Sequence, residues 1–176
     1  MPNIFSVRQS DPPEEQIKIS DAGTDALIAA LVLAGSQLAV SDHQKQLIVW
    51  LAEHDRRLGT GFLGFCIADM PWSPDTFPQD RAFMVRVVDA ASEERGWETL
   101  GIQPDAMQLR PILGWFRKRF VRFQAEDIAP HAREDWFDDM EDDDPVRTGF
   151  PQCEKHHAFL SYLGCQVCHM QRGGTV

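Results

Sequence analysis

Residues 151–170 have the sequence PQCEKHHAFLSYLGCQVCHM and contain three of the chain's four cysteines. A cysteine and a histidine with two residues between them form one pair, and two cysteines with the same spacing form a second pair. A two-residue gap lets both members of a pair face one metal ion, and two such pairs joined by a short arm supply the four ligands of tetrahedral zinc. The sequence therefore predicts one structural zinc ion per chain, with the ligands Cys153, His156, Cys165 and Cys168.

The arm between the two pairs supports this prediction. Its sequence, AFLSYLG, has apolar residues and a glycine directly before Cys165, which suits a short hairpin with the second pair at its end. The histidine ligand stays open between His156 and His157, because both spacings from Cys153 reach the metal. Four protein ligands leave no open position for the water molecule that catalytic zinc requires, so we expect a structural site.

Four alternatives to zinc remain for these cysteines. CQVCH matches the attachment pattern of c-type haem, but that chemistry requires export, and the N-terminal residues lack the basic and apolar regions of a signal peptide. A CxxC redox motif opens a helix after a strand, whereas we expect no helix after this one. A structural disulfide is disfavoured by the same lack of a signal peptide. Reduced cysteines without a metal are the fourth alternative.

The length and composition are those of an ordinary soluble protein. The chain has 176 residues, enough for one domain with a hydrophobic core and a small appendage. It is 43% hydrophobic and 25% charged, and no apolar run approaches the 18 or more residues that a membrane span needs. We therefore expect a cytoplasmic protein that does not enter a membrane.

Two buried helices are predicted near the N-terminus. Residues 24–37 are apolar on most sides, with Thr24 as the N-terminal cap and Gly35 at the end. Ser41 caps the next helix, and Gln44 completes a capping box three residues later. The buried face of this second helix is predicted to contain Leu47, Trp50, Leu51, His54 and Leu58.

Two further helices are predicted at residues 79–95 and 104–123. The first ends before Gly96, and the second has Pro104 in its first turn. Pro111 is expected to kink or divide the second helix, because proline lacks the N–H that an interior position needs. The basic face of this helix consists of Arg117, Lys118, Arg119 and Arg122.

The fold class that follows is mostly α, with a core of four to five helices and a small C-terminal zinc knuckle. Residues 3–7 and 16–20 form possible short strands. We predict a helical core domain at residues 1–124, an acidic linker at 125–149 and the zinc-knuckle appendage at 150–176.

The net charge of −10 is concentrated in one part of the chain. Ten of the 27 acidic residues and one of the 17 basic residues lie in residues 126–144, here called the acidic segment, which therefore contributes −9. Direct nucleic-acid binding is not expected, because phosphate neutralisation needs Lys and Arg. Apolar anchors within a charged field suit docking on a basic surface, either the basic face of residues 117–122 or a separate basic protein. The predicted contact residues are Trp136, Phe137, Asp138, Asp139, Asp142 and Asp143.

Residues 151–168 resemble zinc-knuckle and zinc-ribbon ends in general. In such modules the metal replaces a hydrophobic core and fixes a small surface, whose flanking residues contact nucleic acid or protein. The flanks here contain few bases, Lys155 and Arg172, so the resemblance favours a contact with protein.

No catalytic motif stands out. The sequence has no phosphate-binding glycine loop, no GxSxG elbow and no HExxH. We therefore expect a non-enzymatic interaction protein, inhibitor-, immunity- or adaptor-like, that binds a basic protein partner. The first alternative is an enzyme or small-ligand-binding protein with a pocket around residues 54–77, where His54 precedes a glycine-, proline- and aromatic-rich connector. The second alternative is a zinc-bearing regulatory subunit associated with nucleic acid.

Overall fold

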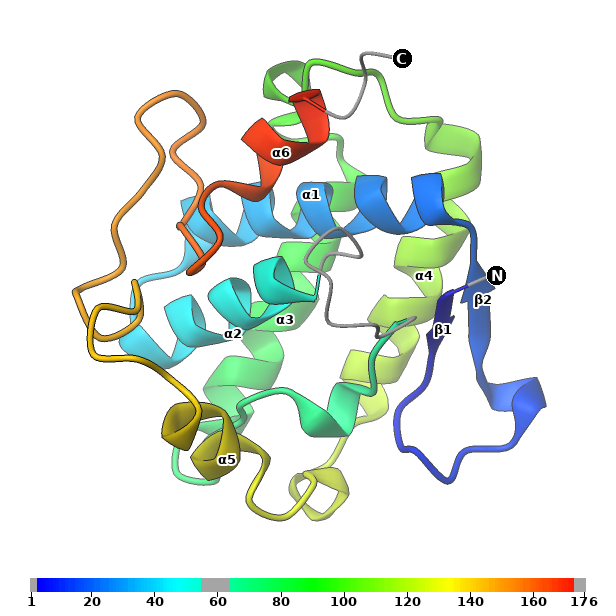
Figure 1. The fold of residues 1–176 in the computed structure, drawn as a ribbon. Helices are drawn as coiled ribbons and strands as arrows, with labels where there is room; N and C mark the ends of the chain where they lie inside the picture. The colour runs from blue at the N-terminus through cyan, green and yellow to red at the C-terminus, as the bar shows by residue number, and fades with distance from the viewer. Residues whose placement is uncertain (1–2, 55–63, 173–176) are drawn as a thin grey trace.

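The computed structural model describes residues 3–54 and 64–172 of the protein (Figure 1). Over these residues the chain is mostly helical, with a two-stranded sheet at the N-terminal end and a cluster of cysteines and a histidine near the C-terminal end. The predicted fold class is confirmed. Among the same residues, no helix combines the length and the apolar character that crossing a membrane would require.

A short hairpin begins the chain. Strand β1 (Asn3–Phe5) pairs antiparallel with β2 (Ile17–Ile19), and a single 3-10 turn, η1 (Pro13–Glu15), lies between them. Phe5 is fully buried and contacts two aromatic rings of the core edge-on. The two short strands lie within the segments predicted as possible strands, and Phe5 anchors them on the helical core.

Helix α1 (Asp21–Leu38) is the central element, and thirteen consecutive residues of it are buried. It begins earlier than predicted, because the side chain of Ser20 accepts a hydrogen bond from the N–H of Gly23. The hydroxyl of Thr24, predicted as the cap, instead accepts a hydrogen bond from the Asn3 side chain at 2.8 Å. The cap prediction was wrong because an equally good capping residue stands one turn earlier.

Gly35 does not end α1, which continues to Leu38. A Cβ atom at this position would lie 2.1 Å from Cδ1 of Ile48. The glycine therefore permits the close approach of α2 (Asp42–Glu53), which packs along α1. The prediction that Gly35 ends the helix was therefore wrong, because the glycine lies inside the helix and allows close packing.

The start of α2 is as predicted, with Ser41 and Gln44 forming a capping box. The helix ends at Glu53, with His54 as its C-terminal cap. The predicted continuation to Leu58 lies outside the described residues.

Helices α3 (Phe77–Ser92) and α4 (Ala106–Arg122) complete the core and pack against each other and against α1. Helix α4 runs without a break through Pro111, so the predicted division is wrong. The ring of Pro111 is exposed, and the buried face of the helix (Leu109, Leu113, Phe116, Phe120) holds the helix together despite the missing hydrogen bond.

Two short helices follow the core. Helix α5 (Ala132–Asp138) lies within the predicted linker, and α6 (Gln166–Arg172) lies alongside α1 (Figure 1). The backbone N–H of Phe159 also donates to the hydroxyl of Ser36 in α1, at 3.0 Å. The C-terminal residues are thus packed on the central helix, and the division of the chain at residues 124 and 149 stays a prediction.

Candidate metal centre and acidic surface

The first ligand pair lies on a tight turn. The N–H of His157 donates to the carbonyl of Cys153 at 2.8 Å, and the N–H of Cys153 donates to the carbonyl of Ala158 at 2.9 Å. His157 takes a left-handed conformation with φ of 54°, which reverses the chain. His156 is therefore buried and directed inward, whereas His157 is exposed. The structure resolves the choice that the sequence left open, because His156 is the histidine in the cluster.

The second pair lies at the start of α6. Gly164, with φ of 94°, closes a turn with Ser161, and the helix begins directly after Cys165. The N–H of His169 donates to the carbonyl of Cys165 at 3.1 Å, which places Cys168 nearly one turn further along the same side. A helix after the CxxC was not expected, because residues 166–172 are too few to show a helical apolar pattern.

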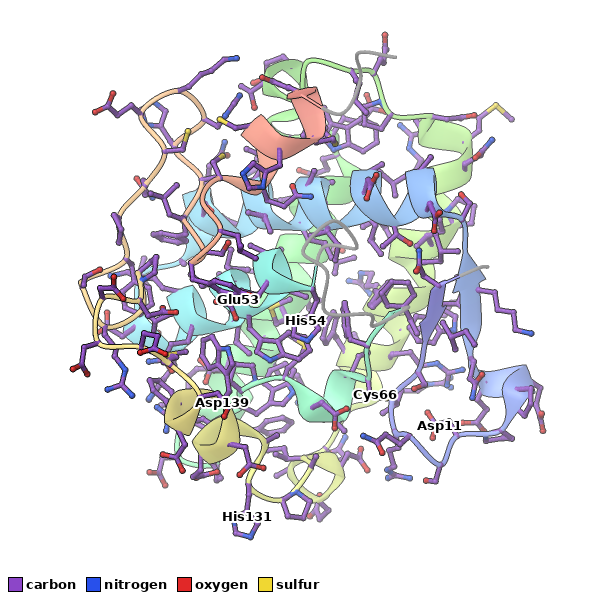
Figure 2. The ribbon with its side chains drawn as sticks, viewed as in Figure 1. Asp11, Glu53, His54, Cys66, His131 and Asp139 are labelled. Atoms are coloured by element: carbon purple, nitrogen blue, oxygen red, sulfur yellow. The ribbon has the colours of Figure 1, made fainter. Side chains whose placement is uncertain are left out.

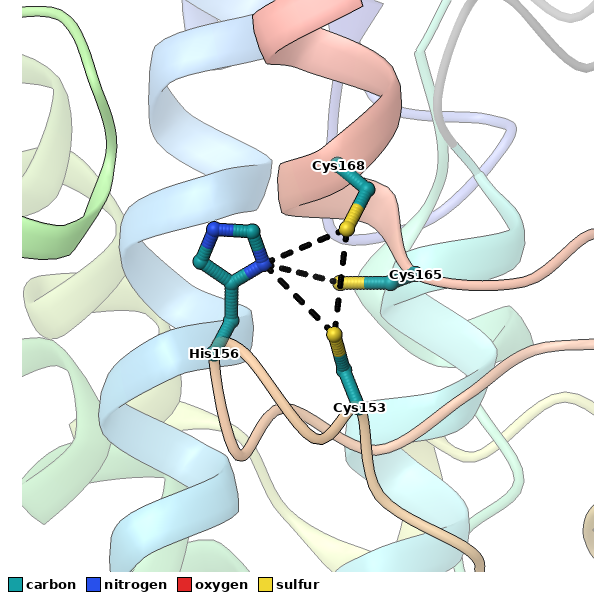
Figure 3. A group of neighbouring side chains, drawn as sticks. All are labelled: Cys153, His156, Cys165 and Cys168. Atoms are coloured by element: carbon teal, nitrogen blue, oxygen red, sulfur yellow. Dashed lines mark hydrogen bonds between the residues drawn. The ribbon is translucent and has the colours of Figure 1, made fainter.

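The four predicted ligand atoms converge, all lying within 4.8 Å of one another (Figure 3). The sulfurs of Cys153 and Cys168 are 3.7 Å apart, and Nδ1 of His156 lies 3.6, 3.6 and 3.3 Å from the sulfurs of Cys153, Cys165 and Cys168. A metal with bonds of about 2.3 Å to sulfur and about 2.0 Å to nitrogen in a tetrahedron requires sulfur–sulfur edges of about 3.8 Å and sulfur–nitrogen edges of about 3.5 Å. The four residues therefore fit one metal ion.

The surroundings shift the pKa values of the cluster in both directions. Burial raises the pKa of the Cys165 thiol to about 12. For Cys153, burial acts in the same direction, but the backbone N–H groups of His156 and Lys155 outweigh it and lower the pKa. Burial and the charge of Lys155 lower the pKa of His156, which favours the neutral imidazole that binds metals. Several thiolates side by side need a positive charge between them, which a divalent ion supplies.

All four cysteines of the chain are free thiols. The fourth, Cys66, is half-buried far from the cluster in sequence, and its sulfur lies 3.1 Å from the hydroxyl of Ser6. Cys66 is not among the ligand candidates.

The acidic segment packs on α2 and not on the basic face of α4. The indole N–H of Trp136 donates to Oε2 of Glu53 at 2.8 Å, and Arg133 reaches the side chain of Gln46 at 3.4 Å. The two acceptors are seven positions apart on α2, and the two donors are three positions apart on α5, so both pairs join one face of each helix.

The predicted internal docking on residues 117–122 is therefore wrong for the described residues. Arg117 instead pairs with Asp89 of α3, with nitrogen–oxygen distances of 2.6 and 3.3 Å, and Arg119 donates to the carbonyl of Glu15. The basic face already has nearer partners, and the aromatic residues of the acidic segment find their contacts on α2.

The six predicted contact residues fall into two groups. Trp136 and Phe137 are half-buried between α5 and its neighbours, and the guanidinium of Arg133 lies over the Phe137 ring at 4.8 Å. The four predicted aspartates are exposed, and none has a side-chain hydrogen bond or an ion pair within the described part of the chain: Asp138, Asp139, Asp142 and Asp143.

A cavity of about 530 Å³ lies between α5, the residues that follow it and the end of α2. Trp136, Asp139 and Asp143 line it, whereas Phe137, Asp138 and Asp142 do not. Sequence reasoning missed the three lining residues that lie outside the acidic segment, Glu53, Pro145 and Tyr162. The signal for Glu53 was a carboxylate two helical turns after Gln46, on a face of α2 that is otherwise buried.

A second cavity, of about 460 Å³, falls partly in the region of the predicted pocket at residues 54–77. His54 lines it together with Asp69 and Asp135. The His54 ring stacks on Trp50 with a centroid distance of 3.6 Å, and its Nδ1 lies 2.7 Å from the Trp50 carbonyl. Burial lowers the pKa of His54, and the neutral ring donates from Nδ1 to the Trp50 carbonyl, so its Nε2 can act as an acceptor. Residues 55–63 of the predicted pocket lie outside the described residues.

Comparison with known proteins finds no matching family model, no similar curated protein and no similar solved structure. The functional argument therefore rests on the two sites themselves.

Proposed function

We propose that the protein is a non-enzymatic, zinc-stabilised interaction protein whose acidic segment binds a basic protein partner. In this proposal the zinc ion fixes residues 150–172 on α1, and the acidic segment forms the contact surface. The closed set of four converging ligands is the observation that supports it best.

Zinc is the metal that this ligand set favours. Three thiolates and one imidazole in a tetrahedron are a usual structural zinc site, whereas magnesium and calcium require oxygen ligands. The site has four protein ligands, so no position remains for a reactive water molecule. A structural role for the metal follows.

Elemental analysis of the purified protein tests the metal. We expect about one zinc ion per chain, and replacement by cobalt should give the visible absorption bands of a tetrahedral thiolate site. Protein that has been purified without chelators and contains no zinc, or that shows haem absorption, would refute the assignment.

The exposed aspartates support the contact surface. The acidic segment contributes −9 of the net charge, and its predicted contact aspartates face solvent. A surface of one sign accelerates association with a partner of the opposite sign, and it disfavours nucleic acid. The cytoplasmic location stays a prediction.

Association kinetics test the contact surface. A variant with Asn at Asp138, Asp139, Asp142 and Asp143 should capture less of a basic protein from native extract than the unmodified protein does. With the captured protein purified, this variant should associate more slowly at low salt, with a smaller effect on dissociation, and the difference in association rate should fade as salt increases. An unchanged association rate at low salt would exclude this surface.

A second candidate function is small-ligand binding at the His54 cavity. A neutral histidine that lines the cavity together with two carboxylates is the observation that favours it. His54→Gln should then abolish ligand binding found in a metabolite screen while leaving the basic-partner association unchanged.

A further inference from the structure

The cavity between α2 and α5 combines negative charge with aromatic surface. Its lining includes four carboxylates from the acidic segment together with Glu53, and two aromatic residues, Trp136 and Tyr162. Among its described lining residues there is no Lys, Arg or His. The nearby Arg133 and Arg147 bind Gln46 and the Phe137 carbonyl. A hollow of this composition attracts cations.

Glu53 is a buried carboxyl group in the cavity that lowers the stability of the fold when it is charged. The residue is buried, with 8% of its surface exposed, and its one hydrogen-bond partner among the described residues is the indole N–H of Trp136. Burial raises the pKa of this carboxyl from 4.5 to about 7, against the effect of the Trp136 hydrogen bond, and the charge of Asp144 raises it further. A buried carboxylate without a positive partner destabilises a fold. A cation in the cavity would remove that cost.

The arrangement favours an organic cation over a metal ion. The only group of described residues whose ligand atoms lie close enough to hold a metal is the Cys/His cluster. The carboxylates around the cavity are too far apart to share a compact ion, but they can surround a larger group. The two aromatic residues add surface that an organic cation contacts favourably and a hydrated metal ion does not.

We propose that this cavity binds a guanidinium or alkylammonium group, presented as an arginine or lysine side chain by the basic partner. The inference rests on the proposed function, because it names the part of the partner that the acidic surface receives. Asp139 follows the end of α5 and Glu53 ends α2, so the group enters between the two helices (Figure 2).

The experiment uses the full-length, zinc-loaded protein and a small probe, N-acetyl-arginine amide, with the neutral isostere N-acetyl-citrulline amide as control. The indole N–H resonance of Trp136 reports binding, because that group contacts Glu53. We expect a saturable shift with the arginine probe at about millimolar concentration and none with citrulline. Equal shifts with both probes would overturn the proposal. So would a saturable shift with calcium at lower concentration.

Variants separate the cavity from general charge. Glu53→Gln should weaken arginine binding at least about fivefold, and Asp139→Asn should also weaken it. Asp138→Asn, which removes the same charge from the neighbouring exposed position outside the cavity, is the matched control and should change the affinity less than about twofold. Equal losses in Asp138→Asn and Asp139→Asn, or no loss in Glu53→Gln, would overturn the proposal. A thermal melt of each variant at the same pH shows that lost binding is not lost folding.

The source of the cation is tested with the partner itself. Glu53→Gln should increase the dissociation rate of the basic partner, whereas Asp138→Asn should not, and free spermidine should compete only at concentrations that saturate the cavity. If Glu53→Gln weakened binding of the arginine probe but left the dissociation rate of the basic partner unchanged, the cavity would not receive a side chain of that partner. The proposed function fails by a different result, an unchanged association rate in the variant with four substitutions, so the two failures are distinguishable.

Discussion

In α1, thirteen of eighteen residues are buried, and the helix is held by apolar contacts on several sides. Residues 151–172 contrast with this, because they contain few large buried apolar side chains: Phe159, Val167 and Met170. Their two turns meet at the cluster of three sulfurs and one imidazole nitrogen. The core is therefore expected to tolerate loss of the metal, and the C-terminal segment is expected to lose its order without it.

The largest effect is expected from Cys165→Ser. Loss of one thiolate should lower zinc affinity more than about 100-fold, because the remaining ligands no longer close the tetrahedron. Hydrogen exchange should then increase in residues 150–172 and stay slow in α1, α3 and α4. Cys66→Ser is the matched control, because Cys66 is a free thiol outside the cluster, and it should retain the zinc. A variant or a chelator that melts the whole protein would show that the core depends on the metal, and that the boundary at residue 150 is wrong.

The cluster of three cysteines and one histidine was predictable because its members are close together in the sequence. Cys153 and Cys168 are fifteen positions apart, and spacing alone constrains which side chains can share an ion. The acidic cavity was not predictable in this way, since Glu53 and Trp136 are 83 positions apart and meet only after α5 has packed on α2. Helix α6 was missed because it has only seven residues, too few to show a helical apolar pattern. Gly35 is a similar case, because the sequence shows the glycine but cannot show that Ile48 packs against it.

The next largest effect concerns the edge of the core, at Glu53. The folded-state pKa of about 7 exceeds the ordinary value of 4.5, so the folded protein holds the proton more tightly and loses stability as pH rises from about 4.5 to about 7. The full penalty is about 3 kcal/mol above pH 7. Glu53→Gln should therefore raise the free energy of unfolding at pH 8 by up to about 3 kcal/mol, and by little near pH 4. Urea denaturation across this pH range measures it, and a variant that is less stable at pH 8 would show that the carboxylate is favourably paired.

Gly35→Ala tests how tightly the core is packed. The added methyl would lie 2.1 Å from Cδ1 of Ile48, so α1 and α2 must separate, at a cost of about 1–3 kcal/mol. Gly114→Ala is the control in α4, where no atom lies within 4 Å of the added methyl, and it should stabilise the protein by about 0.5–1 kcal/mol. Both free energies come from urea denaturation of the zinc-loaded protein. Equal changes in the two variants would mean that α1 and α2 have room to adjust.

The smallest expected effect distinguishes the two adjacent histidines. His157 is exposed and has φ of 54°, a conformation that glycine adopts at little cost, whereas His156 directs Nδ1 toward the three sulfurs. His157→Gly should therefore leave zinc affinity within about twofold and stabilise the turn by at most about 1 kcal/mol. His156→Gly removes a ligand and should release the metal. Competition with a chromogenic chelator measures both affinities. If His157→Gly released zinc as readily as His156→Gly, His157 would also be a ligand. The turn that directs His156 inward and His157 outward would then be wrong.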